Sequence, residues 1–488
     1  MGDWQIVVDK ATKAATTWSS SDPSHRASIL ESIGRGLDEN AERLVQIAAD
    51  ETHLGNARLR GELLRTVFQL GLFAKVLREG SAFEATIDHL DDDWGMGPRP
   101  DVRRILIPVG PVVVFAASNF PFAFSTVGGD TASALAAGCP VILKGHPGHP
   151  QLTEATAAVV SRVLQAEGVE PGVFSVIYGE DDARRVLLDE RVKAGAFTGS
   201  FSAGRHLFDL ASSRRVPIPF YAEMGSVNPV IVTREAIEVR GKEIAQGYVD
   251  SFTLGAGQFC TKPGILLVPS NSEILDDIKG AVEEKEASQL LNDHIASGFS
   301  RRLSELSGNP LVKVIRAGQI SGQISSPTLL ATSGAAFLEG RSDLGTECFG
   351  PASLCVEYDN DSQLLDIVRS FEGELTGTIW AQGSEGILFD LTTLLAARVG
   401  RVVFNGWPTG VSVTWAMTHG GPYPATTSVL HTSVGTTAIR RFLRPVSFQS
   451  MPDHLLPPGL QEENPLRLPR RVDGVLQTGT HSISDKGE

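Results

Sequence analysis

Cysteine is scarce in this sequence, and an excess of positive charge is missing. Four cysteines in 488 residues are too few for the disulfide framework of a small secreted protein, so we expect reduced thiols and a cytoplasmic protein. The formal net charge is −14, and a surface of that sign does not favour phosphate backbones. The charge therefore argues against nucleic acid as a partner.

Long apolar runs are also missing. The longest one, Ile105 to Ala117, is interrupted by Pro108, Gly110 and Pro111 and is shorter than the roughly 20 residues that span a bilayer. The first residues lack the basic region and apolar core of a secretory signal, so we expect no membrane partner. Hydrophobic residues make up 42% and charged residues 20%, which is typical of globular proteins, and the length allows several domains.

The chain changes its pattern near residue 105. Before it, apolar positions recur at three- and four-residue steps, which predicts helices, with Ser21 or Asp22 before Pro23 as a helix start. After it, short apolar runs alternate with helical patterns such as Ser125–Ala137. This alternation predicts an α/β fold with parallel strands that are covered on both faces. The expected strands are Val112–Phe115, Val141–Leu143, Phe174–Ile177, Val230–Val232, Ile265–Val268, Ser353–Val356, Thr378–Trp380 and Val402–Phe404.

Cys260 lies in a stretch of small residues, Gly255 to Thr261. A cysteine is most often a small buried hydrophobe. Two glycines within five residues make a flexible loop instead, in which backbone amides could stabilise an exposed thiolate. The stretch therefore favours a nucleophile, although a packing role stays open.

Glu223 and Asn119 each follow an apolar run and precede a turn. Glu223 is either a surface carboxylate at a strand end or a general base that activates water. Asn119 is either a turn residue or an amide that donates to an oxyanion. The carboxyl end of a parallel strand is the usual place for ligands in such sheets, which favours function.

Three further stretches have the chemistry of a nucleotide site. Gly199 and Ser200 open a helix after an apolar run, where backbone amides can bind phosphate, although an ordinary turn would look the same. Lys144 is a solvated cation at a strand end or a ribose contact. Glu347 and Phe349 precede Gly350-Pro351 and form either an ordinary loop with a buried aromatic or a contact to a nicotinamide ribose.

Together these residues resemble the aldehyde dehydrogenase superfamily along nearly the whole chain. Within it, the sequence is similar to the branch of the 2,5-dioxovalerate (α-ketoglutaric semialdehyde) dehydrogenases and the NADP-dependent fatty aldehyde dehydrogenases. The stretches that carry this likeness are Asn119–Phe124, Lys144–Pro150, Asn405–Gly410, His419–Thr426 and Pro469–Gly474.

The resemblance implies a fold and a set of roles. The implied domains are a Rossmann-like cofactor domain (1–95 and 108–223), an α/β catalytic domain (224–432), a small β oligomerisation arm (96–107 and 433–450) and a C-terminal extension (451–488). A homodimer or homotetramer is implied, and no metal. The implied site residues are Cys260 as nucleophile, Glu223 as base and Asn119 as oxyanion donor, with Lys144, Gly199, Ser200, Glu347 and Phe349 on the cofactor.

The same likeness predicts the cofactor and the substrate. Members that prefer NAD carry a glutamate three residues after the lysine, and this sequence has Pro147 there. Because no carboxylate would repel a 2′-phosphate, NADP is favoured over NAD. The expected reaction converts 2,5-dioxopentanoate to 2-oxoglutarate. A long-chain fatty aldehyde or acyl transfer to coenzyme A are the alternatives, and Phe120, Phe122, Phe124 and Phe259 could line an apolar tunnel.

Overall fold

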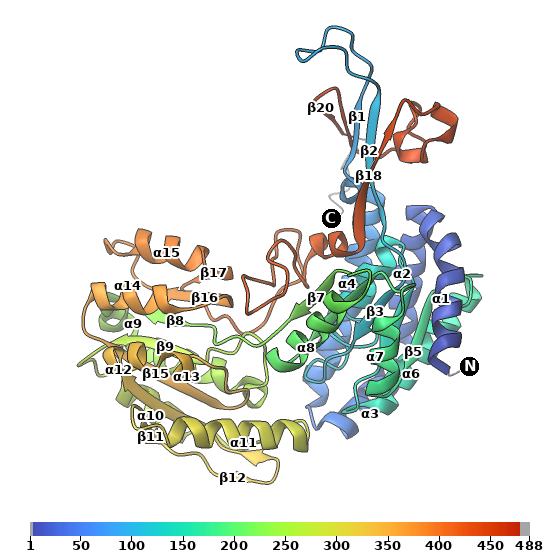
Figure 1. Ribbon diagram of the computed structural model, residues 1–488. Helices are drawn as coiled ribbons and strands as arrows, with labels where there is room; N and C mark the ends of the chain where they lie inside the picture. Colours follow the sequence, from blue (N-terminus) through green and yellow to red (C-terminus); the bar gives the residue numbers. More distant parts are fainter. Residues whose placement is uncertain (1–2, 479–488) are drawn as a thin grey trace, which may run out of the picture.

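The computed structural model describes residues 3–478. The chain forms two lobes, each built on its own sheet, and an arm of long strands that projects from the first lobe (Figure 1). The ends of the predicted segments 1–95 and 451–488 lie outside the described residues. Within residues 3–478, no helix is long and apolar enough to cross a bilayer.

Four helices precede the first sheet, in the region where the sequence predicts helices. Asp22 caps the second helix by accepting hydrogen bonds from the backbone N–H groups of Ser24 and His25, at 2.7 and 3.3 Å. This confirms the predicted helix start before Pro23. The helices are α1 (Asp3–Ser20), α2 (Pro23–Glu39), α3 (Ala41–Thr52) and α4 (Asn56–Glu79).

The first lobe holds a five-stranded parallel sheet in the order β5-β4-β3-β6-β7. Its central strand, β3 (Val112–Phe115), is buried at every residue, which is why it reads as a continuous apolar run. The other strands are β4 (Val141–Lys144), β5 (Phe174–Ile177), β6 (Ala194–Thr198) and β7 (Phe220–Glu223), and the helices are α5 (Gly129–Ala137), α6 (Pro150–Ala166), α7 (Glu180–Leu188) and α8 (Phe201–Ser213).

The helix expected from Ser125 begins later, at Gly129. Residues 121–127 form turns instead. A Cβ at Gly128 would lie 2.4 Å from the carbonyl oxygen of Ala123, so the chain folds back on itself there at a close approach that a glycine allows.

The second lobe holds a seven-stranded sheet in the order β11-β14-β15-β9-β8-β16-β17, in which only the edge strand β11 is antiparallel. The sequence pattern identified β8, β9, β15, β16 and β17 but not β14 or α9. The strands are β8 (Val230–Val232), β9 (Ile265–Pro269), β11 (Lys313–Arg316), β14 (Thr328–Ser333), β15 (Ala352–Tyr358), β16 (Glu374–Trp380) and β17 (Val399–Phe404). The helices are α9 (Arg234–Thr253), α10 (Ile274–Glu283), α11 (Asp293–Ser307), α12 (Gly334–Glu339), α13 (Arg341–Leu344), α14 (Asp361–Ser370) and α15 (Leu388–Ala396). A small side sheet contains β10 (Ser288–Gln289), β12 (Ile320–Ser321) and β13 (Ile324–Ser325).

The arm is a five-stranded sheet in the order β18-β2-β1-β19-β20. Its two long strands, β2 (Val102–Pro108) and β18 (Leu443–Gln449), pair antiparallel along their whole length and fall almost entirely within the predicted arm segments. The sheet also includes β1 (Ala85–Asp88), β19 (Arg470–Val472) and β20 (Val475–Gln477). The domain boundaries, and the assembly that this arm would serve, stay predictions.

Candidate active site

Four strands of the first lobe end at one edge of the sheet, and each end carries predicted site residues. Lys144 is the last residue of β4, Asn119 follows β3, Gly199 and Ser200 follow β6, and Glu223 ends β7. Parallel strands bring their carboxyl ends together. The fold therefore gathers at one edge residues that are up to 104 positions apart in the sequence.

Cys260 comes from the second lobe, on a loop that only a glycine-rich stretch can form. Gly255, Ala256 and Gly257 all have positive φ, at 57°, 57° and 67°, in the left-handed region that glycine enters freely. A Cβ at Gly257 would lie 2.2 Å from the carbonyl oxygen of Gly350. The cysteine loop thus touches the loop of Glu347 and Phe349 backbone to backbone, which explains why position 257 needs glycine.

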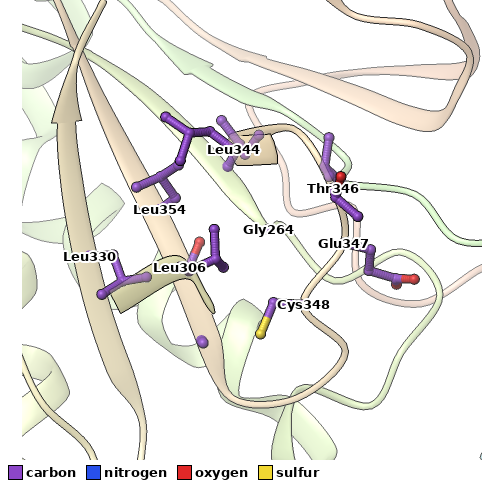
Figure 2. A pocket seen from close by; sticks show the side chains of 12 residues that line it. Gly264, Leu306, Leu330, Leu344, Thr346, Glu347, Cys348 and Leu354 are labelled. Atoms are coloured by element: carbon purple, nitrogen blue, oxygen red, sulfur yellow. The ribbon is translucent and has the colours of Figure 1, made fainter. Parts of the chain in front are cut away.

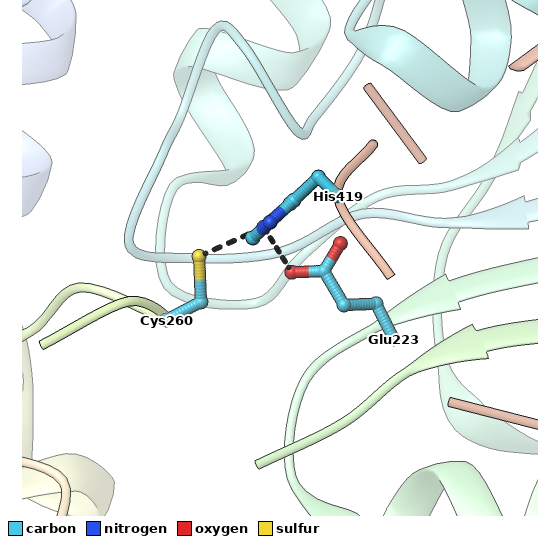
Figure 3. Close-up of side chains that lie close together, drawn as sticks. All are labelled: Glu223, Cys260 and His419. Carbon is cyan, nitrogen blue, oxygen red and sulfur yellow. Dashed lines mark hydrogen bonds and ion pairs between the residues drawn. The ribbon is translucent and has the colours of Figure 1, made fainter. Parts of the chain in front are cut away.

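Two predicted residues, Cys260 and Glu223, meet an unpredicted one, His419 (Figure 3). Sγ of Cys260 lies 3.3 Å from Nε2 of His419, and the same nitrogen lies 2.9 Å from Oε1 of Glu223. The hydroxyl of Ser433 donates to the other carboxylate oxygen of Glu223. Cys260 is half-buried, whereas His419 is 1% and Glu223 4% exposed. Neither His419 nor Ser433 was among the predicted site residues.

A single segment brings His419 and Ser433 to the edge of β7. The backbone N–H of Thr427 donates to the carbonyl of Ala222 at 3.1 Å, and that of Met224 donates to the carbonyl of Ala425 at 2.8 Å. The N–H of Ser433 then donates to the carbonyl of His419 at 2.9 Å. Because these bonds hold both ends of the segment 419–433, the imidazole of His419 and the hydroxyl of Ser433 each contact one carboxylate oxygen of Glu223.

The electrostatics of this cluster set its resting protonation state. Burial alone would raise the pKa of Glu223, but the charge and hydrogen bond of His419, together with the hydrogen bond from Ser433, outweigh it and lower that pKa. Burial raises the pKa of the Cys260 thiol well above its ordinary value, and the negative charge of Glu223 adds to the effect. The stable form is a thiol beside an ionised carboxylate, so the carboxylate can act as a base.

Asn119 lies beside the cysteine loop. Its side-chain Nδ2 donates to the carbonyl oxygen of Gln258 at 3.1 Å, two residues before Cys260. Its own carbonyl accepts from the guanidinium of Arg58 at 2.8 Å. One amide N–H of Asn119 is thus held by the loop, and the other is available to an oxygen bound near the sulfur. The oxyanion role of Asn119 stays a prediction.

The residues predicted to hold a cofactor surround the same edge. Ser200 caps α8, with its hydroxyl accepting from the N–H of Ala203, and the N–H of Gly199 donates to the carbonyl of Glu223 at 3.1 Å. Burial lowers the pKa of Lys144 at the end of β4. The N-terminus of a 13-residue helix, α8, directly follows the strand end, and such a terminus suits an anionic diphosphate.

Glu347 completes this arrangement from the other lobe. A Cβ at Gly225 would lie 2.4 Å from Oε2 of Glu347, so the carboxylate rests against the backbone just after the base. Burial raises its pKa to about 7. Figure 2 shows this carboxylate pointing away from a small pocket that is lined mainly by apolar side chains, among them Leu306, Leu330 and Leu354. Cys260 does not line that pocket, and we assign the pocket no role.

The chemistry of the cluster alone has two interpretations. A cysteine, a histidine and a glutamate whose ligand atoms lie within 4.8 Å of one another are a donor set that zinc also accepts. The same atoms suit a nucleophile with its base.

The model of the aldehyde dehydrogenase family matches residues 2–297. The chain belongs to this family. An α-ketoglutaric semialdehyde dehydrogenase of Acinetobacter baylyi is 41% identical over 96% of the chain and 91% of the relative. A protein of Azospirillum brasilense, named α-ketoglutaric semialdehyde dehydrogenase 2, is 42% identical over 93% of the chain and 87% of the relative.

The fold agrees with this membership. The glyceraldehyde-3-phosphate dehydrogenase GapN of Methanocaldococcus jannaschii, solved in complex with NADP, covers 91% of the chain with a TM-score of 0.78, at 19% identity; the chain covers 93% of it. The aldehyde dehydrogenase fold predicted from the sequence is thus confirmed, as is the activity class: this protein is an NAD(P)-dependent oxidoreductase that converts an aldehyde to an acid.

Replacing His419 in this aldehyde dehydrogenase with asparagine should move the acid limb of its pH profile. The hydrogen bond and the electrostatic interaction with His419 that lower the pKa of Glu223 would be lost, while burial, which raises that pKa, would remain. A base must be ionised to act, so a higher pKa shifts the loss of activity to higher pH. The pH dependence of steady-state turnover measures the shift, and Ser433→Ala should move it in the same direction by less.

The matched control is His431→Asn. His431 is half-buried and contacts Ser428 rather than Glu223, so this variant should keep the wild-type acid limb. An unchanged profile in the His419 variant would remove that residue from control of the base.

Proposed function

We propose that the protein oxidises 2,5-dioxopentanoate to 2-oxoglutarate with NADP, through a thioester on Cys260. The observation that carries the proposal is the cluster of Cys260, His419 and Glu223 between the two lobes, in a chain that is 41–42% identical to two α-ketoglutaric semialdehyde dehydrogenases. A nucleophile beside a buried base is the arrangement that forms and hydrolyses a thioester.

The first step removes the thiol proton. Nε2 of His419 lies 3.3 Å from the sulfur and 2.9 Å from the carboxylate, so a neutral imidazole can take the proton from Cys260, and Glu223 stabilises the imidazolium that results. The sulfur then forms a bond to the aldehyde carbon, and the carbonyl oxygen gains the negative charge. The free amide N–H of Asn119 and the backbone N–H of Cys260 stabilise this oxyanion.

The cofactor is held by residues from both lobes. Lys144, Gly199 and Ser200 would bind its adenosine and diphosphate, and Glu347 and Phe349 its nicotinamide ribose. When bound, a nicotinamide cofactor would supply the hydride acceptor for oxidation of the aldehyde carbon. Pro147 leaves no carboxylate next to a 2′-phosphate, which favours NADP over NAD.

Hydrolysis of the thioester uses Glu223 again. After the imidazolium of His419 has lost its proton to solvent, the lowered pKa of Glu223 keeps the carboxylate ionised. Its oxygen and the sulfur lie within 4.8 Å of each other, close enough for one water to bridge them. Glu223 deprotonates that water, the oxygen attacks the acyl carbon, and the carbon–sulfur bond breaks to release the acid. A base in this position favours water over coenzyme A as the acceptor of the acyl group.

A comparison of substrates tests the proposal. We expect kcat/KM for 2,5-dioxopentanoate to exceed that for pentanal by about 100-fold or more, because a site built for a charged group gains little from an uncharged analogue. Decanal should be poorer still, and NADP should give a higher kcat/KM than NAD. Reduced cofactor, followed by its absorbance, is the measurement.

Other results would contradict specific parts of the proposal. Faster turnover of decanal would make the protein a fatty aldehyde dehydrogenase. Acceleration by coenzyme A, with formation of an acyl-coenzyme A, would replace hydrolysis by acyl transfer. A higher kcat/KM with NAD would overturn the cofactor preference alone.

A further inference from the structure

A charged stripe on α4 faces the interior of the protein. Arg58, Glu62 and Arg65 are spaced four and three residues apart, which places them on one face of the helix. Glu62 is 5% exposed and both arginines are half-buried. The neighbouring Arg60 faces outward, where its side chain is 44% exposed and pairs with Asp38 at 3.4 Å. A charged stripe that faces inward needs a reason, because burying charge is costly.

Arg58 contacts the loop that carries Cys260. Its guanidinium carbon lies 4.8 Å from the centre of the Phe259 ring and 5.3 Å from that of Phe120. A Cβ at Gly255 would lie 2.6 Å from Nη1 of this arginine. The guanidinium is therefore stacked on the aromatic residue next to the nucleophile.

Arg65 reaches the same site about two turns further along the helix. Its guanidinium carbon lies 5.5 Å from the centre of the Phe124 ring, and that ring packs edge-on at 6.4 Å from the imidazole of His419. The charge of Arg65 acts on both Cys260 and Glu223. Each arginine thus contacts an aromatic ring near the cluster: Arg58 contacts Phe259, next to Cys260 in sequence, and Arg65 contacts Phe124, whose ring packs on His419.

The protein leaves this pair of cations incompletely neutralised. Glu62 is the acid on the same stripe, and its Oε1 accepts the N–H groups of Phe122 and Ala123 at 2.8 and 2.9 Å. Glu223, the other acid near Arg65, is held by His419 and Ser433. Within residues 3–478, Nε and Nη1 of Arg58 and Nη1 of Arg65 are buried without a hydrogen-bond partner. The two guanidiniums therefore lie near two carboxylates that are already held by other groups, so they can bind a further anion.

We propose that Arg58 and Arg65 bind the carboxylate of the substrate and hold its aldehyde carbon against Cys260. This inference rests on the proposed function and names the residues that select a semialdehyde acid. The rings of Phe120, Phe124 and Phe259 flank the short carbon chain. The same cations make the site unfavourable for a fatty aldehyde, since an alkyl chain would leave them buried and without a partner.

Substituting Arg65 with glutamine tests the assignment. We expect kcat/KM for 2,5-dioxopentanoate to fall about 10- to 100-fold, the usual worth of hydrogen bonds to a charged group, mostly through KM. Pentanal, which has the same number of carbons and no charge, should lose far less. The dissociation constant of the product 2-oxoglutarate, measured by calorimetry, should rise by a similar factor. Arg60→Gln, on the outward face of the same helix, is the matched control and should change none of these values.

A second variant should act in the opposite direction. Glu62→Gln keeps an oxygen for the two N–H groups but removes the competing negative charge, so 2,5-dioxopentanoate and 2-oxoglutarate should bind more tightly. Arg65→Lys keeps the charge and should retain part of the wild-type affinity if Arg65→Gln folds poorly. Thermal unfolding of each variant checks the fold.

Arg58→Gln separates two roles of that residue. Arg58 also donates to the carbonyl of Asn119 at 2.8 Å, so a pure positioning role would lower kcat equally for both aldehydes. A loss confined to the charged substrate supports binding. Two results would overturn the inference. One is an equal loss of kcat/KM on both substrates in the Arg58 and Arg65 variants. The other is that the wild type and Glu62→Gln bind 2-oxoglutarate no more tightly than Arg65→Gln does. Failure of the proposed function looks different, because the wild-type protein would then already prefer an uncharged aldehyde.

Discussion

Replacing Cys260 with alanine should abolish aldehyde oxidation and leave cofactor binding intact. The thioester needs the sulfur, and removal of an enzyme's nucleophile can cost on the order of 10⁶ in kcat. The residues predicted to hold the cofactor lie on other segments, at the ends of β4 and β6 and on the loop before β15. Absorbance of reduced cofactor measures the activity, and calorimetry with NADP measures the binding.

Cys355→Ala is the matched control for this experiment. Cys355 lies on β15 with its side chain fully buried among apolar residues, and burial raises the pKa of its thiol. That variant should keep wild-type kcat while losing some thermal stability, as expected for a small cavity. Activity that survives in the Cys260 variant would place the nucleophile elsewhere.

Glu223→Gln should separate the two halves of the reaction. The thioester should still form, since the sulfur and its oxyanion donors remain, but its hydrolysis should slow about 10²- to 10⁴-fold without the base. Removing the carboxylate charge should also lower the pKa of Cys260, because that charge disfavours the thiolate. The thiolate fraction at neutral pH then rises, and iodoacetamide should modify Cys260 faster than in the wild type.

Rapid mixing with substrate and NADP measures the first effect. The variant should release one equivalent of reduced cofactor per active site in a burst, followed by a slow phase, and intact-protein mass spectrometry should show the acyl group. Cys260→Ala in the same assay should give no burst. Normal steady-state turnover by the glutamine variant would remove Glu223 from the role of base.

Much of the fold and part of the site could be predicted because their signals are local. Buried parallel strands such as β3 read as unbroken apolar runs, and Asn119 and Glu223 follow directly from the ends of two of them. The glycines around Cys260 likewise report a backbone that a side chain would obstruct. In each case, neighbours in sequence carry the information.

His419, Ser433 and the arginines of α4 were not predictable in this way. His419 is 159 residues from Cys260, and its role depends on a segment that pairs with β7. Arg58, Glu62 and Arg65 share a helical face, and a charged face normally points to solvent. Only the packing of α4 shows that this face turns inward, whereas Arg60 meets solvent.

The strand that ends in Glu223 lies at the rim of its sheet, where unpaired backbone groups would otherwise invite association with other chains. Residues 425–427 cover this rim through hydrogen bonds to Ala222 and Met224, and the same segment carries His419 and Ser433. Protection of this sheet edge and the placement of His419 and Ser433 beside Glu223 therefore depend on one set of bonds, so a change that breaks these bonds would affect both.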